Sequence, residues 1–367
     1  MMKILYGIQG TGNGHITRAR HMASSFAKRD DIEVDYLFSG RTDSSFFDMQ
    51  AFPSYKTNRG LTFVTKNGQL SYIKTLLKNN LCRFVKEVSD VNIMQYDLLI
   101  NDFEPVTGWA AKKAGVPSLS ISHQAAYLHH VPKYNQGFLD KLITQHFAPT
   151  KYSIGTHWYH FGHSIIPPVV AADLIESSNK HIKSDVFNNH IVVYLPFESL
   201  SQIRHQLHIL SDWIFVCYHP MIDAKVIDRN IVWQPLSFQN FQRDLVKCSG
   251  VISNSGFELA TECISIGKPL LVKPLQKQYE QLSNAYTLQQ LGLCEVLANL
   301  DAEGIDEWLQ SKHGVKVNFP TDCDDLIEWI AQANWDTTEH ICRQMWQQVS
   351  FPNQVQGKLD TLTRIMN

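Results

Sequence analysis

Residues 10–18 read Gly10-Thr11-Gly12-Asn13-Gly14-His15-Ile16-Thr17-Arg18 and directly follow the apolar segment at residues 4–8. This order predicts a strand, a glycine-rich turn and a helix that has a histidine among its first residues. Glycines let the backbone adopt positive φ and approach a ligand closely. The first N–H groups of a helix have no partner within the helix, so they attract anionic or polar oxygen atoms. The stretch therefore predicts a ligand site where a strand ends and a helix begins.

Two common phosphate-binding loops do not fit this stretch. The dinucleotide fingerprint G-x-G-x-x-G requires a third glycine after Gly10 and Gly12, but that position is His15. A P-loop requires a lysine followed by serine or threonine, and no lysine follows these glycines. The loop therefore belongs to another class of ligand site.

Composition narrows the class of protein. The chain has 367 residues, 44% of them hydrophobic and 19% charged, which suits two globular domains. A net charge of -2 gives no attraction toward nucleic acid. The seven cysteines are scattered without any C-x-x-C pair, so we expect a reducing cytoplasmic location and no zinc cluster. No apolar run approaches the roughly 20 residues of a membrane span, and the start of the chain does not resemble a signal peptide.

Short β-type runs alternate with helical stretches in both halves of the chain. Such alternation is typical of a parallel sheet with helices on both faces. It stops at Ile165-Ile166-Pro167-Pro168, before a polar segment at 176–189. We therefore expect two doubly wound α/β domains over 1–168 and 169–345, and a C-terminal helix over 346–367 that returns to the first domain. The expected strands are 3–8, 33–38, 61–65, 97–101 and 118–121, then 190–195, 213–217, 231–233, 250–253 and 269–272; helices are expected at 15–29, 69–90 and 105–114.

The second half carries a further motif at a strand-to-helix turn. Ser253-Asn254-Ser255-Gly256 ends an expected strand, and Glu262 follows in a helix that is otherwise small and apolar. A polar loop that includes Glu280 and Gln281 comes after the next strand. Ligands bind beyond the carboxyl ends of the strands in open α/β sheets. These residues therefore predict a site in a cleft between the two domains.

The spacing Ser255-Gly256-x5-Glu262, then Gly267-x-Pro269, then Glu280-Gln281-x2-Asn284-Ala285, resembles the nucleotide-sugar site of GT-B glycosyltransferases. The likeness is strongest to the transferases that add N-acetylglucosamine to the lipid-linked peptidoglycan precursor, and it extends to a bacterial and archaeal subgroup of such enzymes. The loop at 10–15 resembles the glycine-rich first loop of the same family. The resemblance implies two Rossmann-like domains facing across a cleft and a transferase of the hexosyltransferase type, active in building the cell envelope.

The resemblance also implies a donor site in the second domain. Glu262 would accept hydrogen bonds from the ribose hydroxyls, and Ser255 with Gly256 would hold the diphosphate at the helix start. Glu280 and Gln281 would face the hydroxyls of the donor sugar. The other residues expected beside the donor are Gly12, Asn13 and Gly14 of the first loop, Leu236 and Phe238 near the nucleobase, Phe197 and Glu198 in the turn after strand 190–195, and His219. In that turn Pro196-Phe197-Glu198 replaces the glycine-rich version of the family.

His15 is the expected catalytic base. An acceptor hydroxyl must lose a proton as its oxygen attacks the anomeric carbon, and histidine titrates near neutral pH. A carboxylate would orient the ring, and Asp102 is the first choice for this partner, with Glu104 the second. The alternative is that His15 and Asp102 merely cap helices. His123 and Gln124 end a neighbouring strand and resemble an acceptor-side segment of the family.

No cofactor and no metal are expected. Asp322 and Asp324 spell a D-x-D pattern, but they precede a late helix, where acidic residues favour the helix dipole. The expected activity is therefore inverting, metal-independent transfer from a nucleotide sugar, with UDP as the nucleotide, to a glycan, a lipid-linked acceptor or a small molecule. Two alternatives remain open, a nucleotide-sugar 2-epimerase of the same fold and a non-catalytic sugar-nucleotide sensor.

Residues 72–86 place apolar side chains at helical spacing beside four cations. A basic amphipathic helix can lie on an anionic membrane surface. An ordinary helix that packs its apolar side on the sheet has the same pattern. Peripheral contact with the inner membrane surface is therefore a secondary expectation.

Overall fold

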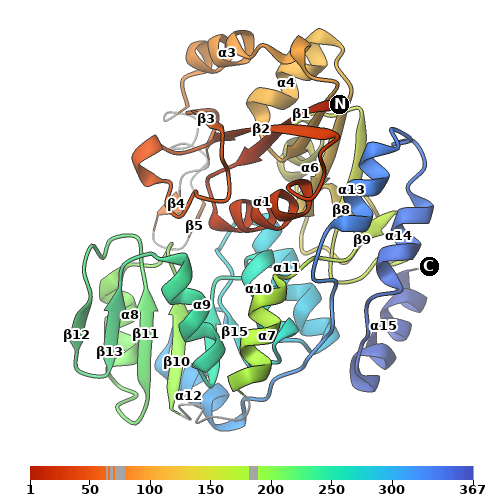
Figure 1. Cartoon of the computed structure of the whole chain (residues 1–367). Coiled ribbons are helices and arrows are strands. Elements are labelled where there is room, and N and C mark those ends of the chain that lie inside the picture. The colour runs from red at the N-terminus through yellow and green to blue at the C-terminus, as the bar shows by residue number, and fades with distance from the viewer. Residues whose placement is uncertain (63–64, 67–68, 71–78, 182–188, 367) are drawn as a thin grey trace.

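The computed structural model describes residues 1–62, 65–66, 69–70, 79–181 and 189–366. Two mainly parallel sheets lie in separate halves of the molecule, each covered by helices, and α1 of the first half meets α10 of the second half between them (Figure 1). The two-domain α/β architecture expected from the alternation is present.

The first domain is built on a seven-stranded sheet in the order β3-β2-β1-β6-β7-β8-β9, with every neighbouring pair parallel. Its strands are β1 (Met2–Gln9), β2 (Ile32–Ser39), β3 (Tyr55–Asn58), β6 (Leu98–Asp102), β7 (Ser118–Ser122), β8 (Tyr152–Thr156) and β9 (Ile165–Ile166), and a separate pair is formed by β4 (Thr65–Lys66) and β5 (Gln69–Leu70). Its helices are α1 (Asn13–Phe26), α3 (Leu81–Asp90), α4 (Pro105–Ala114), α5 (His123–Ala126) and α6 (Phe138–His146).

The second domain repeats this plan with the order β12-β13-β11-β10-β14-β15-β16, where β12 alone runs antiparallel to its neighbour. Its strands are β10 (His190–Tyr194), β11 (Ile214–Tyr218), β12 (Val226–Asp228), β13 (Ile231–Gln234), β14 (Gly250–Ser253), β15 (Leu270–Val272) and β16 (Glu295–Val296). Its helices are α7 (Ala172–His181), α8 (Leu200–Leu207), α9 (Phe238–Lys247), α10 (Phe257–Ser265), α11 (Tyr279–Leu291) and α12 (Ala302–Ser311).

Strand periodicity divides the side chains of β1 between two cores. Ile4, Tyr6 and Ile8 point to one face and pack with Met22 of α1, whereas Leu5 points to the other face, where it joins the core under α4. Successive strand residues alternate between faces, so a strand that is covered on both sides is apolar throughout. The apolar run at residues 4–8 therefore forms a central strand. The turn that follows this strand lies near the middle of the sheet, at the carboxyl ends of the strands.

The C-terminal part of the chain corrects the expected domain division. Helices α13 (Asp324–Ala331) and α14 (Glu339–Trp346) bury Leu326, Ile330 and Met345 in the core of the first domain, beside α1. The final helix α15 (Asn353–Met366) packs instead on α11 of the second domain. The chain thus crosses to the first domain before residue 346, and residues after it return (Figure 1). Both crossings are driven by burial of the apolar faces of amphipathic helices.

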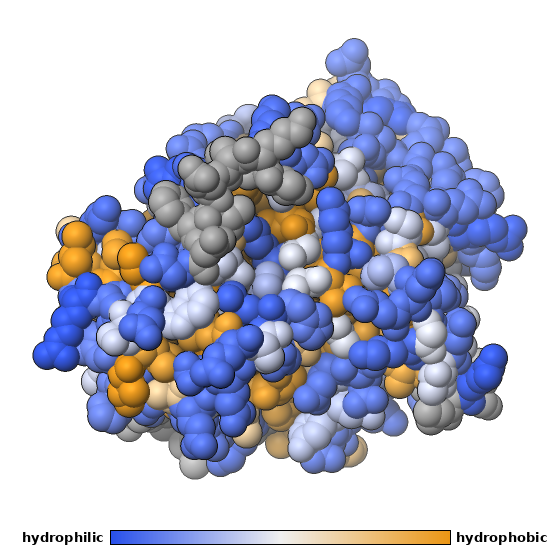
Figure 2. Space-filling model, turned by 90° about the horizontal axis from the view of Figure 1, so that it is seen from below, coloured by the Kyte–Doolittle hydropathy of each residue, from blue (hydrophilic) through white to orange (hydrophobic). Residues whose placement is uncertain are grey.

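Several elements differ from the sequence-based expectation. Strands β3, β8, β9, β12 and β16 were not expected. Four of them, β3, β9, β12 and β16, are sheet edges of two to four residues, and β8 lies next to the edge strand β9. The expected helix over 69–90 begins only at Leu81, after Asn80 caps it by accepting from the Arg83 N–H, and residues 71–78 lie outside the described ones. Within the described residues, no helix has the length and apolar character needed to cross a membrane. Figure 2 shows one face of the molecule, on which hydrophobic patches lie between hydrophilic residues.

Candidate active site

The sheet register brings His15 and Asp102 together. In the pairing of β1 with β6, Ile8 lies opposite Asp102, so Asp102 ends its strand beside the turn that follows β1. That turn starts α1, with Gly12 as its N-cap residue, and His15 lies in the first turn of the helix. Nδ1 of His15 lies 2.8 Å from Oδ1 of Asp102. The expected contact between the two residues is therefore present.

The contact fixes the tautomer of the neutral imidazole. A carboxylate only accepts hydrogen bonds, so Nδ1 carries the proton and Nε2 is left with its lone pair. The Asp102 side chain is fully buried, while His15 keeps 16% of its side chain exposed. An imidazole that is held by a buried carboxylate and still reaches solvent is suited to accept a proton from a bound hydroxyl.

Glu104 does not contact His15. The expectation that it could be the second-choice partner of His15 is therefore wrong. Its Oε1 accepts hydrogen bonds from Ser39 Oγ and the Val106 N–H, and its Oε2 accepts from the backbone and side chain of Thr107. Glu104 is the N-cap of α4 and is fully buried. Burial raises its pKa, and these hydrogen bonds oppose the rise. Helix capping is therefore the role of Glu104 and not of Asp102.

Arg18 and Glu258 join this centre, and neither was among the residues expected to act there. Arg18 lies one helical turn after His15, and its Nη1 donates to Asp102 Oδ1 at 2.8 Å. Its Nε and Nη2 donate to Oε1 of Glu258, on α10 of the second domain, at 2.9 and 2.6 Å. An arginine three residues after the base on one helix was the available signal, because residues at that spacing share a helix face.

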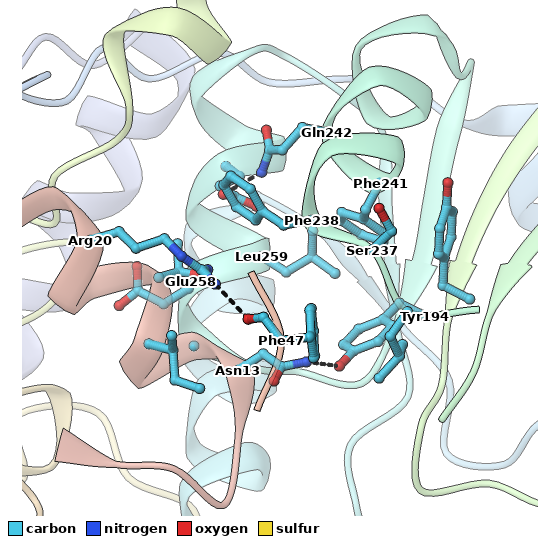
Figure 3. Close-up of a pocket in the computed structure, with 16 residues that line it drawn as sticks. Asn13, Arg20, Phe47, Tyr194, Ser237, Phe238, Phe241, Gln242, Glu258 and Leu259 are labelled. Atoms are coloured by element: carbon cyan, nitrogen blue, oxygen red, sulfur yellow. Dashed lines mark hydrogen bonds between the residues drawn. The ribbon is translucent and has the colours of Figure 1, made fainter. Parts of the chain in front are cut away.

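A pocket lies next to this centre at the junction of the two domains, and Figure 3 shows the side chains from α1, α9 and α10 that converge on it. Asn13 reaches across to Tyr194, with a hydrogen bond of 3.0 Å. The backbone N–H of Phe238 donates to Asp48 at 2.8 Å, again across the domains. The lining residues are Asn13, Gly14, Ile16, Thr17, Arg20, Phe47, Tyr194, Tyr218, Leu236, Ser237, Phe238, Phe241, Gln242, Glu258, Leu259 and Glu262.

Five residues expected beside the donor therefore line one pocket: Asn13, Gly14, Leu236, Phe238 and Glu262. The Arg20 guanidinium lies over the Phe238 ring, 4.5 Å from its centroid, and no sequence signal marked this contact.

Gly14 lies where α1 of the first domain packs closely on α10 of the second. A Cβ at this position would lie 3.2 Å from Cγ of Glu258, so even alanine would press on the second domain.

Glu262 lies one helical turn after Glu258 on α10 and is 6% exposed. Its Oε1 accepts a hydrogen bond of 2.8 Å from Gln242 Nε2. Burial raises the pKa of Glu262 to about 7, although the Gln242 hydrogen bond opposes the rise. A carboxyl group in a pocket wall with a pKa near neutral is held partly protonated by its burial. Hydrogen bonds from a ligand would favour its ionised form.

The expected diphosphate and sugar residues are mostly engaged with the protein. Ser255 Oγ donates to the Gln281 carbonyl at 2.7 Å, and Gln281 Oε1 accepts from the Leu275 N–H at 2.9 Å. Glu280 accepts a hydrogen bond of 2.9 Å from Gln124 of the first domain. Gly256 caps α10 without any side-chain cap, and a Cβ there would meet no atom within 4 Å. The open helix start, more than the Ser255 hydroxyl, is the feature suited to an anion.

The turn after β10 has a structural role and not the expected place beside the donor. Glu198 forms a buried ion pair of 2.6 Å with Lys273, and both side chains are less than a tenth exposed. Nε2 of His219 donates a hydrogen bond of 3.1 Å to the Glu198 carbonyl oxygen. Phe197, Glu198 and His219 are absent from the lining of the pocket between the domains, within the part of the chain that is described. No sequence motif indicated that Lys273 would form this ion pair.

His123 is a buried interdomain contact. Its Nε2 lies 2.7 Å from Asn284 of α11, and its ring stacks on Phe257 of α10 at 4.0 Å. Burial lowers its pKa.

Gln124 instead lines a second cavity, of about 470 Å³, and its buried Oε1 has no hydrogen-bond partner among the described residues. Polar side chains around this cavity are Lys112, Ser118, Ser120, Ser122, Thr144, Gln145, His146, Thr150, Lys151 and Ser153.

The two carboxylates of the D-x-D pattern have partners near α1. Asp324 accepts from Ser25 and Lys28 at 2.6 to 2.8 Å, and Asp322 accepts from the Asp324 N–H at 3.0 Å. Among the residues that the structure describes, no group of three or more histidine, cysteine or acidic side chains could hold a metal ion.

Comparison with protein families gives a direct result. Residues 2–312 match the model of glycosyl transferase family 1. The chain belongs to this family. It is therefore a glycosyltransferase, as the resemblance in the sequence implied. No curated protein sequence matches the chain.

Solved structures show the same fold. MurG of Acinetobacter baumannii matches with a TM-score of 0.51 and 16% identity, over 99% of this chain and 100% of that one. UGT2 of Phytolacca americana, complexed with UDP-2-fluoro-glucose and pterostilbene, matches with a TM-score of 0.56 and 12% identity over the full length of both chains. The kitacinnamycin glycotransferase gives 0.55 and 12%, over 99% of this chain and 98% of that one. The two Rossmann-like domains of the GT-B fold are thereby confirmed.

Proposed function

We propose that this glycosyltransferase is inverting and metal-independent, and that it moves a sugar from a UDP-linked donor to an acceptor hydroxyl. The observation that carries the proposal is the His15–Asp102 pair, 2.8 Å apart, on the wall that faces the helix bearing Glu262. A base and an adjacent nucleotide pocket are the two parts that a single displacement between bound substrates requires.

In the proposed reaction the acceptor oxygen forms a bond to the anomeric carbon while the bond from that carbon to the diphosphate oxygen breaks. The acceptor proton passes to Nε2 of His15, and the nucleoside diphosphate leaves with the electron pair of the broken bond. One displacement from the opposite side inverts the anomeric configuration. The open start of α10 at Gly256 supplies N–H groups and a positive dipole end for the charge of the leaving group.

The donor would bind in the pocket between the domains. Glu262 would accept from the ribose hydroxyls, and Leu236 with Phe238 would border the base. The bound UDP-2-fluoro-glucose in the Phytolacca enzyme supports UDP as the nucleotide. The donor screen is thermal-shift and calorimetric titration with UDP-, GDP-, dTDP- and CMP-sugars, where a UDP-sugar should bind with the highest affinity.

Product analysis then tests the reaction type. Slow hydrolysis of the bound donor, with water in the place of the acceptor, should release free sugar of inverted anomeric configuration, seen by NMR within the first minutes. Release with retained configuration would contradict the proposed mechanism. A C2 epimer of the donor would identify a nucleotide-sugar epimerase, and binding without chemistry toward any acceptor would identify a sensor.

Metal removal provides a separate prediction. Donor binding and turnover should persist in EDTA with at most a small loss, because the leaving group is met by N–H donors and a helix dipole. The measurement is the initial rate with and without EDTA, followed by addition of Mg²⁺ or Mn²⁺. A rate abolished by EDTA and restored by either ion would contradict metal independence.

Peripheral membrane contact stays a prediction. The described part of the segment, α3, exposes Leu81 and Val85 by 61% and 62%. Its cations Arg83 and Lys86 pair with Glu87 and Asp90 one turn later, so this part adds no net charge. Co-sedimentation with phosphatidylglycerol vesicles, compared between the parent and a Leu81→Ser/Val85→Ser variant, decides the matter, because contact through α3 requires weaker binding by the variant.

A further inference from the structure

Arg18 connects the catalytic pair of one domain to the donor helix of the other. It donates to Asp102 through Nη1 and to Glu258 through Nε and Nη2, with all three distances between 2.6 and 2.9 Å. Asp102 Oδ1 thus accepts from both His15 and Arg18. The side chains of Arg18, Asp102 and Glu258 are 11%, 0% and 7% exposed, so water screens their charges weakly.

The charges of this cluster decide how strongly it supports a protonated His15. Asp102 alone would offer one negative charge, but Arg18 shares the same oxygen atom and cancels that charge. Burial raises the pKa of Glu258, while the charge and hydrogen bonds of Arg18 oppose the rise. With Glu258 ionised, the charge is restored, and Asp102, Arg18 and Glu258 together carry one net negative charge beside the imidazole. Burial lowers the pKa of Arg18, but Asp102 and Glu258 outweigh this effect and raise it, so Arg18 stays charged.

We propose that Arg18 is a positioning residue and that Glu258, reaching across from the donor domain, sets the basicity of His15. The proposal deepens the proposed function, on whose assignment of His15 as the base it rests. Glu258 lies one turn before Glu262 on α10, and Phe257, the first residue of that helix, lies under the Arg18 guanidinium at 5.7 Å. A donor that binds at Glu262 and holds α10 in this position therefore also holds the charge that keeps His15 a good base.

The benefit of this arrangement is a base that is strongest when the domains are closed. Without Glu258 nearby, Arg18 neutralises Asp102 and the imidazole loses the charge that stabilises its protonated form. The conformation that contains a bound donor is then also the one in which proton transfer to His15 is most favourable.

The variants leave the other ionisable groups near the cluster unsubstituted. They are Tyr6 of β1, His21 of α1, His123 of α5, Glu262 of α10, Glu280 of α11 and Cys323 before α13. Of these, Glu262 also titrates near neutral pH, because burial raises its pKa to about 7. Burial and the charge of Arg18 lower the pKa of His21 to about 4, so His21 remains neutral in the range of interest.

The test is a direct titration of His15 by NMR, with histidine labelled at Cε1 and the His15 signal identified by its loss in a His15→Gln variant. Glu258→Gln should lower the pKa of His15, because Arg18 then cancels Asp102. Arg18→Met should raise it, because Asp102 then no longer shares its Oδ1 with a cation. Each shift should be about one pH unit, as for a buried neighbouring charge. The double variant Arg18→Met/Glu258→Gln leaves Asp102 as the only charge and should return the pKa to near the parent value.

Opposite shifts from the two single variants, with a return in the double variant, distinguish charge tuning from loss of structure, which would move all three in one direction. Arg204→Met and Asp228→Asn, which break a partly exposed ion pair of 2.6 Å in the second domain, are matched controls and should leave His15 unchanged. If Arg18→Met does not fold, Glu258→Gln and the double variant still decide. An unchanged His15 pKa in Glu258→Gln overturns the inference.

The titration is independent of catalysis, so it separates the two proposals. With UDP-glucose and UDP-N-acetylglucosamine as probes, the acid limb of the kcat/KM profile for donor hydrolysis should move with the NMR pKa in each variant. Shifted titrations without matching activity profiles would remove His15 as the base, while the electrostatic coupling would stand.

Discussion

Replacing His15 with alanine should lower sugar transfer by about 10²–10⁴-fold while leaving nucleotide affinity near that of the parent enzyme. The range is the usual contribution of a general base. Affinity should hold because His15 is not among the residues that line the pocket containing Glu262, within the described part of the chain. A loss confined to kcat is the pattern of a group that acts in the transition state.

The measurement is kcat and KM with the true acceptor, or donor hydrolysis until the acceptor is known, together with calorimetric nucleotide binding. His205→Ala is the matched control, since this histidine is exposed on α8, and its turnover should equal that of the parent. Parent-like turnover by His15→Ala with the true acceptor would remove the base assignment.

Replacing Glu262 with alanine should weaken nucleotide binding by about 10–150-fold, which corresponds to roughly 1.5–3 kcal/mol for hydrogen bonds to a charged group. The carboxylate is buried in the pocket wall, and among the residues that the structure describes its side-chain hydrogen bond comes from Gln242. Ribose hydroxyls would add donors to this carboxylate, and alanine offers none.

The pH dependence of binding provides a second readout of the same residue. Burial raises the pKa of Glu262 to about 7, so the free protein holds a proton there at slightly acidic pH. A ligand that donates hydrogen bonds favours the ionised form, so binding should release a proton and weaken as the pH falls from 8 to 6. Glu262→Gln should bind more weakly than the parent and lose this dependence.

Proton release is measured by calorimetry in two buffers of different ionisation enthalpy. Glu303→Gln, at an exposed position on α12, serves as the control and should retain both the affinity and the pH dependence. If Glu262→Ala binds every nucleotide as tightly as the parent does, the donor pocket is wrongly assigned.

The periodicity of the central strands and the spacing of local motifs were predictable from the sequence. The apolar run after Met2 forms β1, and the helix expected at 105–114 has those bounds as α4. The marginal strands β3 and β16 were not predictable, because they are short and gain their hydrogen bonds from a neighbouring strand rather than from a local pattern. The helices α13 and α14 could be recognised as amphipathic, but not assigned to a domain, because an apolar face does not specify which core it will join.

The sequence by itself determined the kind of molecule. Alternating strands and helices require a parallel sheet, and the glycines before His15 place a helix start at the sheet edge. The tertiary structure decided which side chains act together. Asp102 and Glu104 are two residues apart and chemically alike, yet the β1–β6 register puts one against His15, and the start of α4 engages the other. Arg18 and Glu258 are 240 positions apart, and only the contact of α1 with α10 brings their charges to 2.6 Å. Local sequence fixes secondary structure through short-range sterics and periodicity, whereas ion pairs between domains depend on how two completed domains dock.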